Sequence, residues 1–189
     1  GSDQIISGFG TDDVIGDHGA IDYTAGTFTT SDTAVTMADE GVNEALPGDD
    51  TIILGEGEAR ILAGLGADTI SVGNDNSVVI ADNGSLQYTG DTLVSAISSD
   101  AGLGGDDILR LNDGDAIVIA GFGADDIQIG NGNVDLLADN GEINYTDGST
   151  TTLTSHDADN NTAGADTVVI GDGNTRIIAG LGLKQAVDD

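Results

Sequence analysis

The sequence predicts an all-β protein, a parallel β-solenoid made of nine-residue half-coils with longer spacer loops. Three observations lead to this fold class: a nine-residue period through most of the 189 residues, an apolar triplet in each period, and a glycine-rich hexad beside each triplet. A fixed period is the signature of a repeat architecture. β-branched residues favour strands, and glycine supplies turns with positive φ angles. We therefore expect each short strand to pair in parallel with the equivalent strand one turn away, about 4.8 Å distant.

The nine-residue period is clearest from Gly48 onward. The lines there read GDDTIILGE, GEARILAGL, GADTISVGN, DNSVVIADN and GSLQYTGDT, with an aliphatic residue or Tyr in fifth place. The same five lines return 57 residues later, from Gly105, and a third copy starts at Gly164. Two lines would complete one turn of the coil. We expect a single repeat array over 1–189, whose internal units are about 1–47, 48–104, 105–163 and 164–189.

Irregular stretches separate the repeated blocks, at about 28–47, 93–104 and 150–163. Because 57 equals five nines plus twelve, each stretch can be interpreted as a sixth, longer half-coil, which gives three turns per block. The N-terminal stretch is the longest and contains the only proline, Pro47. We expect it to bulge outward as a loop.

Charge and composition exclude several classes of protein. The chain has 4 basic and 34 acidic residues, a net charge of −30, and no cysteine. This balance excludes a binder of nucleic-acid phosphates, and the lack of thiols excludes disulfides and thiolate zinc sites. No apolar run approaches the length of a membrane span. A compact chain this acidic repels itself, so we expect an external cation, a metal first, to offset the repulsion.

Nothing in the sequence indicates an active site. The two histidines, His18 and His156, are isolated and lack zinc-site spacing. No Ser-His-Asp set or acidic pair has a catalytic context. An aromatic content of 3% counts against a carbohydrate-active β-helix, which would use rings to stack on sugars. We expect a protein that is not an enzyme.

The run AGLGADTI at 63–70 resembles the calcium-binding nonapeptide G-G-x-G-x-D-x-U-x of the RTX (repeats-in-toxin, haemolysin-type) family. Residues 7–12 and 120–125 match it too, as do the Gly-Asp-Asp starts at Gly48 and Gly105. The resemblance implies the β-roll form of the solenoid, several bound calcium ions, and export to the cell surface or the extracellular space of a bacterium. Many lines lack the consensus Asp, so calcium is not implied for every turn.

Alternate lines would stack on the same edge of the coil and bring their aspartates together. Calcium takes six to eight oxygen ligands, which two stacked glycine-rich turns can supply from carboxylates and backbone carbonyls. The best pairs are Asp50 with Asp68 and Asp107 with Asp125. Further candidate ligands are Asp82, Asp139, Asp12 and Asp166. The candidate carbonyl donors are Gly48, Gly64, Gly66, Gly121 and Gly123.

Two alternatives limit this prediction. The aspartates could merely accept hydrogen bonds from backbone N–H groups, as they do in ordinary turns. On the other edge, we expect the acidic residues to form a solvated face without metal; these are Glu56, Glu58, Asp113 and Asp115.

The sixth place of alternate lines would point outward and form an aliphatic row. Its members are Leu62, Ile80, Ile119, Leu137 and Ile178. Such patches usually mark interfaces, so we expect a contact surface for another copy or another domain. The alternative is that the spacer half-coils fold back and cover the row within one chain.

Together these features predict a calcium-stabilised, non-catalytic segment of a large exported bacterial protein, such as an adhesin-like or extracellular-layer scaffold. Its expected partners are neighbouring repeats or copies of itself, laterally or end to end, and neither nucleic acid nor the membrane interior. One alternative is a self-assembling filament or surface-layer subunit. Another is the RTX-type tail of a secreted toxin or hydrolase whose active site lies elsewhere.

Overall fold

The computed structural model describes residues 1–17, 19–22, 29–32, 48–89, 91–146, 149–157, 163–181 and 185–188. All regular structure in these residues is β, in nineteen strands. His18 and Pro47 lie outside the described residues, and so does the loop expected before Pro47. The predicted all-β class is confirmed.

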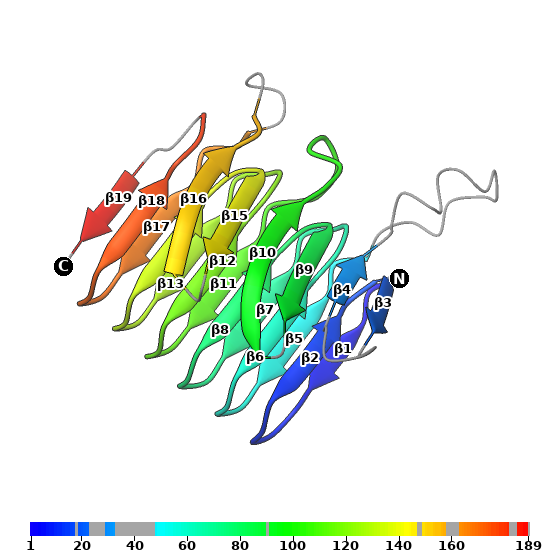
Figure 1. The fold of residues 1–189 in the computed structure, drawn as a ribbon. Coiled ribbons are helices and arrows are strands. Elements are labelled where there is room, and N and C mark those ends of the chain that lie inside the picture. The colour runs from blue at the N-terminus through cyan, green and yellow to red at the C-terminus, as the bar shows by residue number, and fades with distance from the viewer. Residues whose placement is uncertain are drawn as a thin grey trace.

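Two parallel sheets contain most of the repeated lines (Figure 1). The first sheet has seven strands, in the order β1 (Gln4–Ile6), β5 (Thr51–Leu54), β7 (Thr69–Val72), β11 (Ile108–Leu111), β13 (Asp126–Ile129), β17 (Thr167–Ile170) and β19 (Gln185–Asp188). The second has six, in the order β2 (Asp12–Ile15), β6 (Ala59–Leu62), β8 (Ser77–Ile80), β12 (Ala116–Ile119), β14 (Val134–Leu137) and β18 (Thr175–Ile178). The chain alternates between these sheets, and equivalent places pair, as Ile52 does with Ile70.

A third, antiparallel sheet differs from the prediction of six half-coils per block. It contains the strands β3 (Gly19–Asp22), β4 (Thr29–Asp32), β9 (Gly84–Thr89), β10 (Thr92–Ser98), β15 (Gly141–Thr146) and β16 (Ser149–Ser155). In the blocks from Gly48 and Gly105, the fifth line and the stretch after it therefore form a hairpin, and the third line of the N-terminal copy contributes β3 to another. After the hairpin of β9 and β10 the chain resumes the stack directly, because Ile108 of β11 pairs with Thr69 of β7.

The sequence of the β9–β10 hairpin explains why it leaves the stack. The strand at 84–89 alternates buried and more exposed residues, which is the pattern of a sheet with one buried face. Thr89 pairs with Thr92, so only two residues connect the strands, which is a length typical of hairpins. Runs of six and seven residues are also longer than the four-residue strands that make up most of the parallel sheets.

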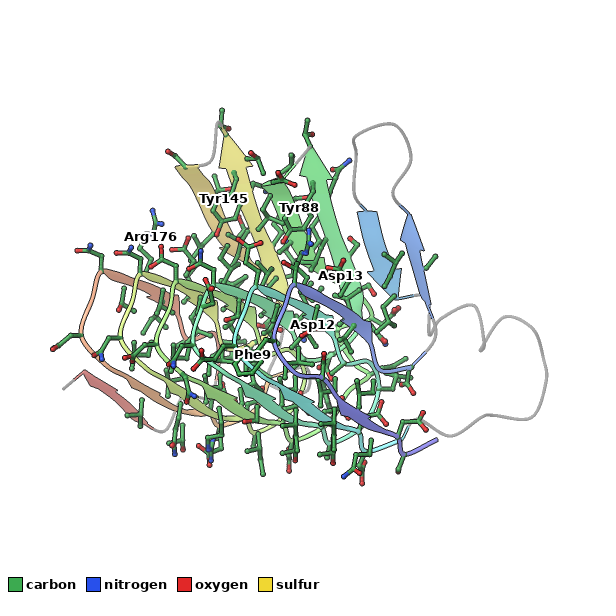
Figure 2. The ribbon with its side chains drawn as sticks, turned by 90° about the horizontal axis from the view of Figure 1, so that it is seen from below. Phe9, Asp12, Asp13, Tyr88, Tyr145 and Arg176 are labelled. Atoms are coloured by element: carbon green, nitrogen blue, oxygen red, sulfur yellow. The ribbon has the colours of Figure 1, made fainter. Side chains whose placement is uncertain are left out.

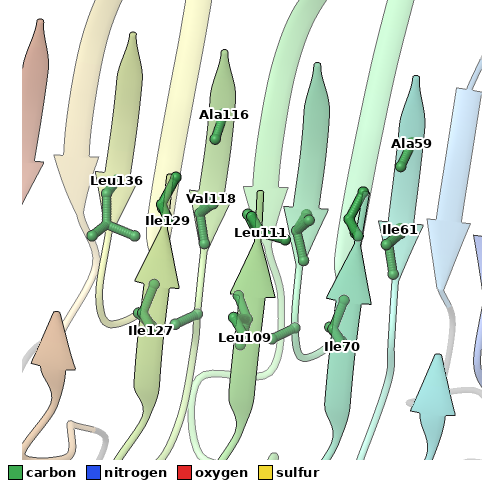
Figure 3. Packing of buried hydrophobic residues seen from close by; sticks show 14 of the residues in the cluster. Ala59, Ile61, Ile70, Leu109, Leu111, Ala116, Val118, Ile127, Ile129 and Leu136 are labelled. Atoms are coloured by element: carbon green, nitrogen blue, oxygen red, sulfur yellow. The ribbon is translucent and has the colours of Figure 1, made fainter. Parts of the chain in front are cut away.

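The main core lies between the two parallel sheets (Figure 3). The fifth place of each line points into it: Ile52, Ile61 and Ile70 are completely buried. The seventh place does so too, as Leu54 and Val72 show. The inward orientation predicted for both places is confirmed.

The aliphatic row predicted as a contact surface is covered by the hairpins of the same chain. Leu62, Ile80 and Ile119 are completely buried and Leu137 is nearly so, while Ile178 is partly buried against them. They form a second core with hairpin residues, among them Leu86, Tyr88, Leu93, Ala96 and Ile143. The prediction of an outward interface is wrong, and the alternative of an intramolecular cover holds. A hairpin is marginal alone, so its apolar face needs such a partner.

Polar contacts also fix the hairpins to the second sheet (Figure 2). The Tyr145 hydroxyl donates a hydrogen bond to Asp135 Oδ2 at 2.9 Å, and Arg176 Nε lies 2.6 Å from Asp135 Oδ1. In the preceding copy, the Arg60 guanidinium lies 5.1 Å from the centre of the Tyr88 ring, within cation–π distance. In both copies a tyrosine of the hairpin and an arginine of the second sheet thus contribute to the attachment.

The second core predicts which substitution destabilises the folded chain. We expect Ile119→Ala to lower the free energy of unfolding by about 2–5 kcal/mol, because it removes buried contacts and leaves a cavity. Ile53→Ala is the matched control, since Ile53 is 40% exposed on the outer face of the first sheet. Urea unfolding at one calcium concentration measures both variants. Dissociation of an oligomer by Ile119→Ala, with unchanged unfolding, would contradict the intramolecular cover.

Candidate functional site

Five aspartates stack at the edge where the chain passes from the second sheet to the first. We call them the aspartate column; they are Asp50, Asp68, Asp107, Asp125 and Asp166. Each immediately precedes a strand of the first sheet, so parallel pairing places one above the next. All are at most 2% exposed. The predicted pairs Asp50 with Asp68 and Asp107 with Asp125 are adjacent in this column, and Asp166 extends it.

One oxygen of each column member accepts a hydrogen bond from the backbone. The backbone N–H of Asp50 donates to Asp68 Oδ1 at 2.6 Å, and that of Asp68 donates to Asp107 Oδ1 at 2.7 Å. The N–H groups of Asp107 and Asp125 donate in the same way to Asp125 and Asp166, at 2.8 and 3.0 Å. Hydrogen bonding to backbone N–H groups, the alternative to metal binding, therefore explains the position of Oδ1 in each of these aspartates.

The other oxygen of each column member has no such role. In all five residues, Oδ2 is buried and has no hydrogen-bond partner. An ionised carboxylate that is buried with an unsatisfied oxygen is unfavourable, so a proton or a cation must compensate it. A column of five such oxygens is the most unusual feature of this edge.

Burial raises the pKa of several of these carboxyl groups. The pKa of Asp68 rises to about 7, that of Asp107 to about 9 and that of Asp125 to about 8. Desolvation is the largest cause in each, and neighbouring carboxylates add to it, such as Asp125 for Asp107 and Asp166 for Asp125. At neutral pH these groups therefore favour the bound proton, unless a cation takes its place.

The candidate carbonyl donors lie in the turns that carry or face the column. Gly66 and Gly123 have φ angles of 136° and 133°, which favour glycine. A Cβ atom on Gly66 would overlap the carbonyl oxygen of Gly48 in the stacked turn. A Cβ atom on Gly64 or Gly121, also at positive φ, would meet a neighbouring carboxylate. Glycine thus lets the backbone of these turns lie close to a stacked carbonyl oxygen or to a carboxylate.

Asp82 and Asp139 lie at the same edge, just after strands β8 and β14. Both are at most 1% exposed. Asp82 accepts a hydrogen bond from the Phe122 N–H on Oδ2, whereas its Oδ1 has no partner. Asp139 accepts from the N–H groups of Gly164 and Leu181, at 3.2 and 2.8 Å, so both of its oxygens are used. The two candidates are equivalent in sequence but differ in how far they are satisfied.

Two aspartates at this edge were missed by the sequence interpretation. Asp17 accepts a hydrogen bond from the Leu65 N–H at 2.8 Å, and it occupies the place of Asp82 in the first copy. The signal was a recurring Gly/Ala-Asp-His/Asn-Gly run, at 16–19, 81–84 and 138–141. Asp3 donates its backbone N–H to Asp50 Oδ1 at 2.7 Å and precedes β1, so it begins the column's edge.

The structure separates Asp12 from the other candidates. Asp12 begins β2, whose partner is β6, so it lies at the opposite edge, beside the turn of Glu58. Its Oδ1 accepts a hydrogen bond from the Ser7 hydroxyl at 2.7 Å. Asp12 therefore does not share an edge with the other candidate ligands, because only alternate lines share an edge, and its role as a metal ligand stays a prediction.

At the opposite edge, side-chain amides lie beside the acidic residues. Glu56, Glu58, Asp113 and Asp115 are all exposed, as the solvated face requires. The amide nitrogens of the neighbouring turns contact three of these carboxylates: Asn74 donates to Glu56, Asn131 to Asp113 and Asn133 to Asp115, at 3.2, 3.0 and 3.0 Å. The aspartate column has no such alternation.

Within the described ranges, no three His, Cys, Asp or Glu side chains form a ready-made metal site. A cation at the column would therefore take carboxylates from stacked turns and complete its shell with backbone carbonyls. No helix in the described part of the chain is long and apolar enough to cross a bilayer. Comparison with family models, curated proteins and solved structures finds no match.

The raised pKa values predict an unusual pH dependence without metal. The folded column keeps its protons up to a pH of about 7 to 9, whereas unfolded aspartates lose theirs near pH 4. Between these values the folded state binds more protons, so raising the pH favours unfolding. In metal-depleted buffer, we expect the free energy of unfolding to fall from about pH 5 to about pH 9, as measured by urea unfolding.

Saturating calcium is the control for this measurement. A cation that replaces the protons should make the free energy of unfolding nearly independent of pH over the same range. Stability that rises with pH in metal-depleted buffer would show that the column carboxylates are not buried as described.

Proposed function

We propose that the protein is a calcium-stabilised, non-catalytic structural segment of an exported bacterial protein, folded as an RTX-like β-solenoid. The observation that carries the proposal is the aspartate column, with five buried Oδ2 atoms that have no hydrogen-bond partner. The match of residues 63–70 to the RTX nonapeptide supports it, because Asp68 is both the consensus Asp and a member of this column.

The donor set favours calcium over other metals. Carboxylate and carbonyl oxygens are hard ligands, and the described residues offer neither thiolate nor clustered imidazole at this edge. Calcium accepts six to eight oxygens in flexible geometry, whereas magnesium demands a near-ideal octahedron. Stacked turns give an irregular set of oxygens, which suits calcium.

Calcium would act on this chain through linkage between binding and folding. The column exists only when the turns are stacked, so the ion binds the folded chain and not the unfolded one. Each site then adds stability by mass action, about 2.7 kcal/mol when free calcium is about 100 times its Kd. A chain with a net charge of −30 would remain expanded where calcium is scarce and fold where it is abundant. This favours a place outside the cell.

A scaffold role follows from the arrangement of the strands. Equivalent strands succeed one another along both parallel sheets, so the molecule lengthens by one strand spacing with every turn (Figure 1). Such a stack serves as a stiff spacer in a surface adhesin or an extracellular layer, and its partners would be neighbouring repeats or further copies.

The proposal predicts that calcium binding depends on one edge only. Asp68→Asn should reduce the number of calcium ions bound per chain and remove about 2.7 kcal/mol of calcium-dependent stability at about 100 times Kd. Asp113→Asn makes the same charge change at the exposed edge and should bind as the unmodified chain does. Equilibrium dialysis gives the ion count, and thermal unfolding in calcium and in chelator gives Tm.

Two results would count against the proposal. An equal Tm in chelator and in millimolar calcium would show that calcium does not stabilise the folded chain. An equal loss of ions in Asp68→Asn and Asp113→Asn would contradict the assignment to one edge.

A further inference from the structure

Polar side chains are buried together where the chain leaves the stack for the β9–β10 hairpin and where it returns. Asp82 and Asn83 precede β9, and Asp100 follows β10. The backbone holds the two ends side by side, because the Ser99 N–H donates to the Asn83 carbonyl at 2.9 Å. Asp82 and Asn83 are completely buried, and Asp100 is half-buried. We call these three residues the hairpin base.

The hairpin base has more polar atoms than the chain satisfies. Both polar atoms of the Asn83 side chain, Nδ2 and Oδ1, are buried without a hydrogen-bond partner. The same is true of Asp82 Oδ1 and Asp100 Oδ2. A buried amide with neither partner is rare, because native structures satisfy almost all such groups. Each of the three side chains thus has a buried oxygen without a hydrogen-bond partner, near the point where the chain leaves and rejoins the stack. Such a set suits a ligand that is coordinated by oxygen atoms.

The second copy shows a contact between two of these three positions. Its equivalents are Asp139, Asn140 and Asp157, each 57 residues further along the chain. Burial raises the pKa of Asp157, and hydrogen bonds from its neighbours, among them the side chain and the backbone of Asn140, oppose this rise. Burial also raises the pKa of Asp139 to about 7, and the charge of Asp157 is among the causes that add to it. In the second copy, the residue after the hairpin thus contacts Asn140 and lies within electrostatic range of Asp139.

Close packing of glycine encloses the Asp82 carboxylate. A Cβ atom on Gly104 or Gly121 would overlap Asp82 oxygens, and both glycines have positive φ angles. Asp100 itself has a φ of 57°, a conformation that aspartate adopts more readily than most residues. The backbone is therefore shaped around the carboxylates of this cluster and does not fill the place with apolar side chains.

We propose that the hairpin base is a divalent-cation site, distinct from the aspartate column, in which Asp82, Asn83 and Asp100 supply the side-chain oxygens. The second copy would supply a corresponding site from Asp139, Asn140 and Asp157, in which the Asp139 oxygens would bind the ion while they also accept hydrogen bonds from the N–H groups of Gly164 and Leu181. Two carboxylates and one amide carbonyl per site, with backbone carbonyls, suit calcium. The inference rests on the proposed function for the identity of the ion, but its ligands Asn83 and Asp100 lie outside the nonapeptide consensus.

The site would tie the hairpin to the stack. The chain leaves after β8 and must return so that β11 pairs in register with β7. An ion bound to both Asp82 and Asp100 would fix the two ends of this excursion at one point. Docking of β9 and β10 over the second core would then depend on the cation.

The test compares three aspartate variants of the full chain, titrated with calcium and counted by equilibrium dialysis. Asp100→Asn should bind one ion fewer than the unmodified chain, and addition of Asp157→Asn should remove a second ion. Asp91→Asn is the control, since Asp91 is exposed at the tip of the same hairpin and undergoes the same charge change. Hydrogen exchange at saturating calcium should be faster in β9 and β10 of Asp100→Asn, with β7 and β11 still protected.

A second variant tests the site without removing a ligand. Asn83→Asp keeps the oxygen and adds a negative charge, so at saturating calcium it should bind as many ions as the unmodified chain and keep its Tm. A fall in the Tm of this variant in calcium would mean that the added carboxylate meets no cation, and it would overturn the inference.

The outcomes separate this inference from the proposed function. An unchanged ion count in Asp100→Asn, together with a loss in Asp68→Asn, would overturn the hairpin-base site and leave the column standing. No calcium binding by the unmodified chain would overturn both.

Discussion

Parallel, in-register pairing of β5, β7, β11, β13 and β17 places like residues over like, one strand spacing or about 4.8 Å apart. For the fifth place of each line this is favourable, because aliphatic side chains pack into a continuous core. For the place before each strand it creates a column of five buried carboxyl groups, which repel one another when they are ionised. The same pairing that builds the core therefore creates the need for positive charge, and the candidate function follows from the fold itself.

The two edges meet this constraint in different ways. At the exposed edge, Glu56, Asn74, Asp113 and Asn131 alternate acid with amide, so that these carboxylates have a neutral donor beside them and water around them. At the buried edge, aspartate follows aspartate and water is excluded. The fold accommodates amides in its turns, as the exposed edge demonstrates. The cation that we propose would compensate the charge concentrated at the buried edge.

The sequence was sufficient to predict the features that depend on the nine-residue period alone. The all-β class, the inward fifth and seventh places and the neighbours Asp50 with Asp68 all follow from counting. The hairpins did not, because GSLQYTGDT begins with glycine and has an apolar residue in fifth place, like the lines that do form the stack. The difference lies in the uninterrupted run of six residues and in the alternation along β9. The row from Leu62 to Ile178 was found correctly, but whether its cover came from the same chain depended on these hairpins.

Asp82 connects the column to the hairpins. Burial raises its pKa well above the ordinary value, and the charge of Asp107, a column member, is the next cause. Asp82 also stands at the exit toward β9, next to Asn83. A cation bound at either place would lower the repulsion felt at the other, because both share the field of this one carboxylate. With the proposed cations bound, stacking of the turns and docking of the hairpins would thus be coupled electrostatically, in addition to their shared apolar contacts at Ile80 and Leu86.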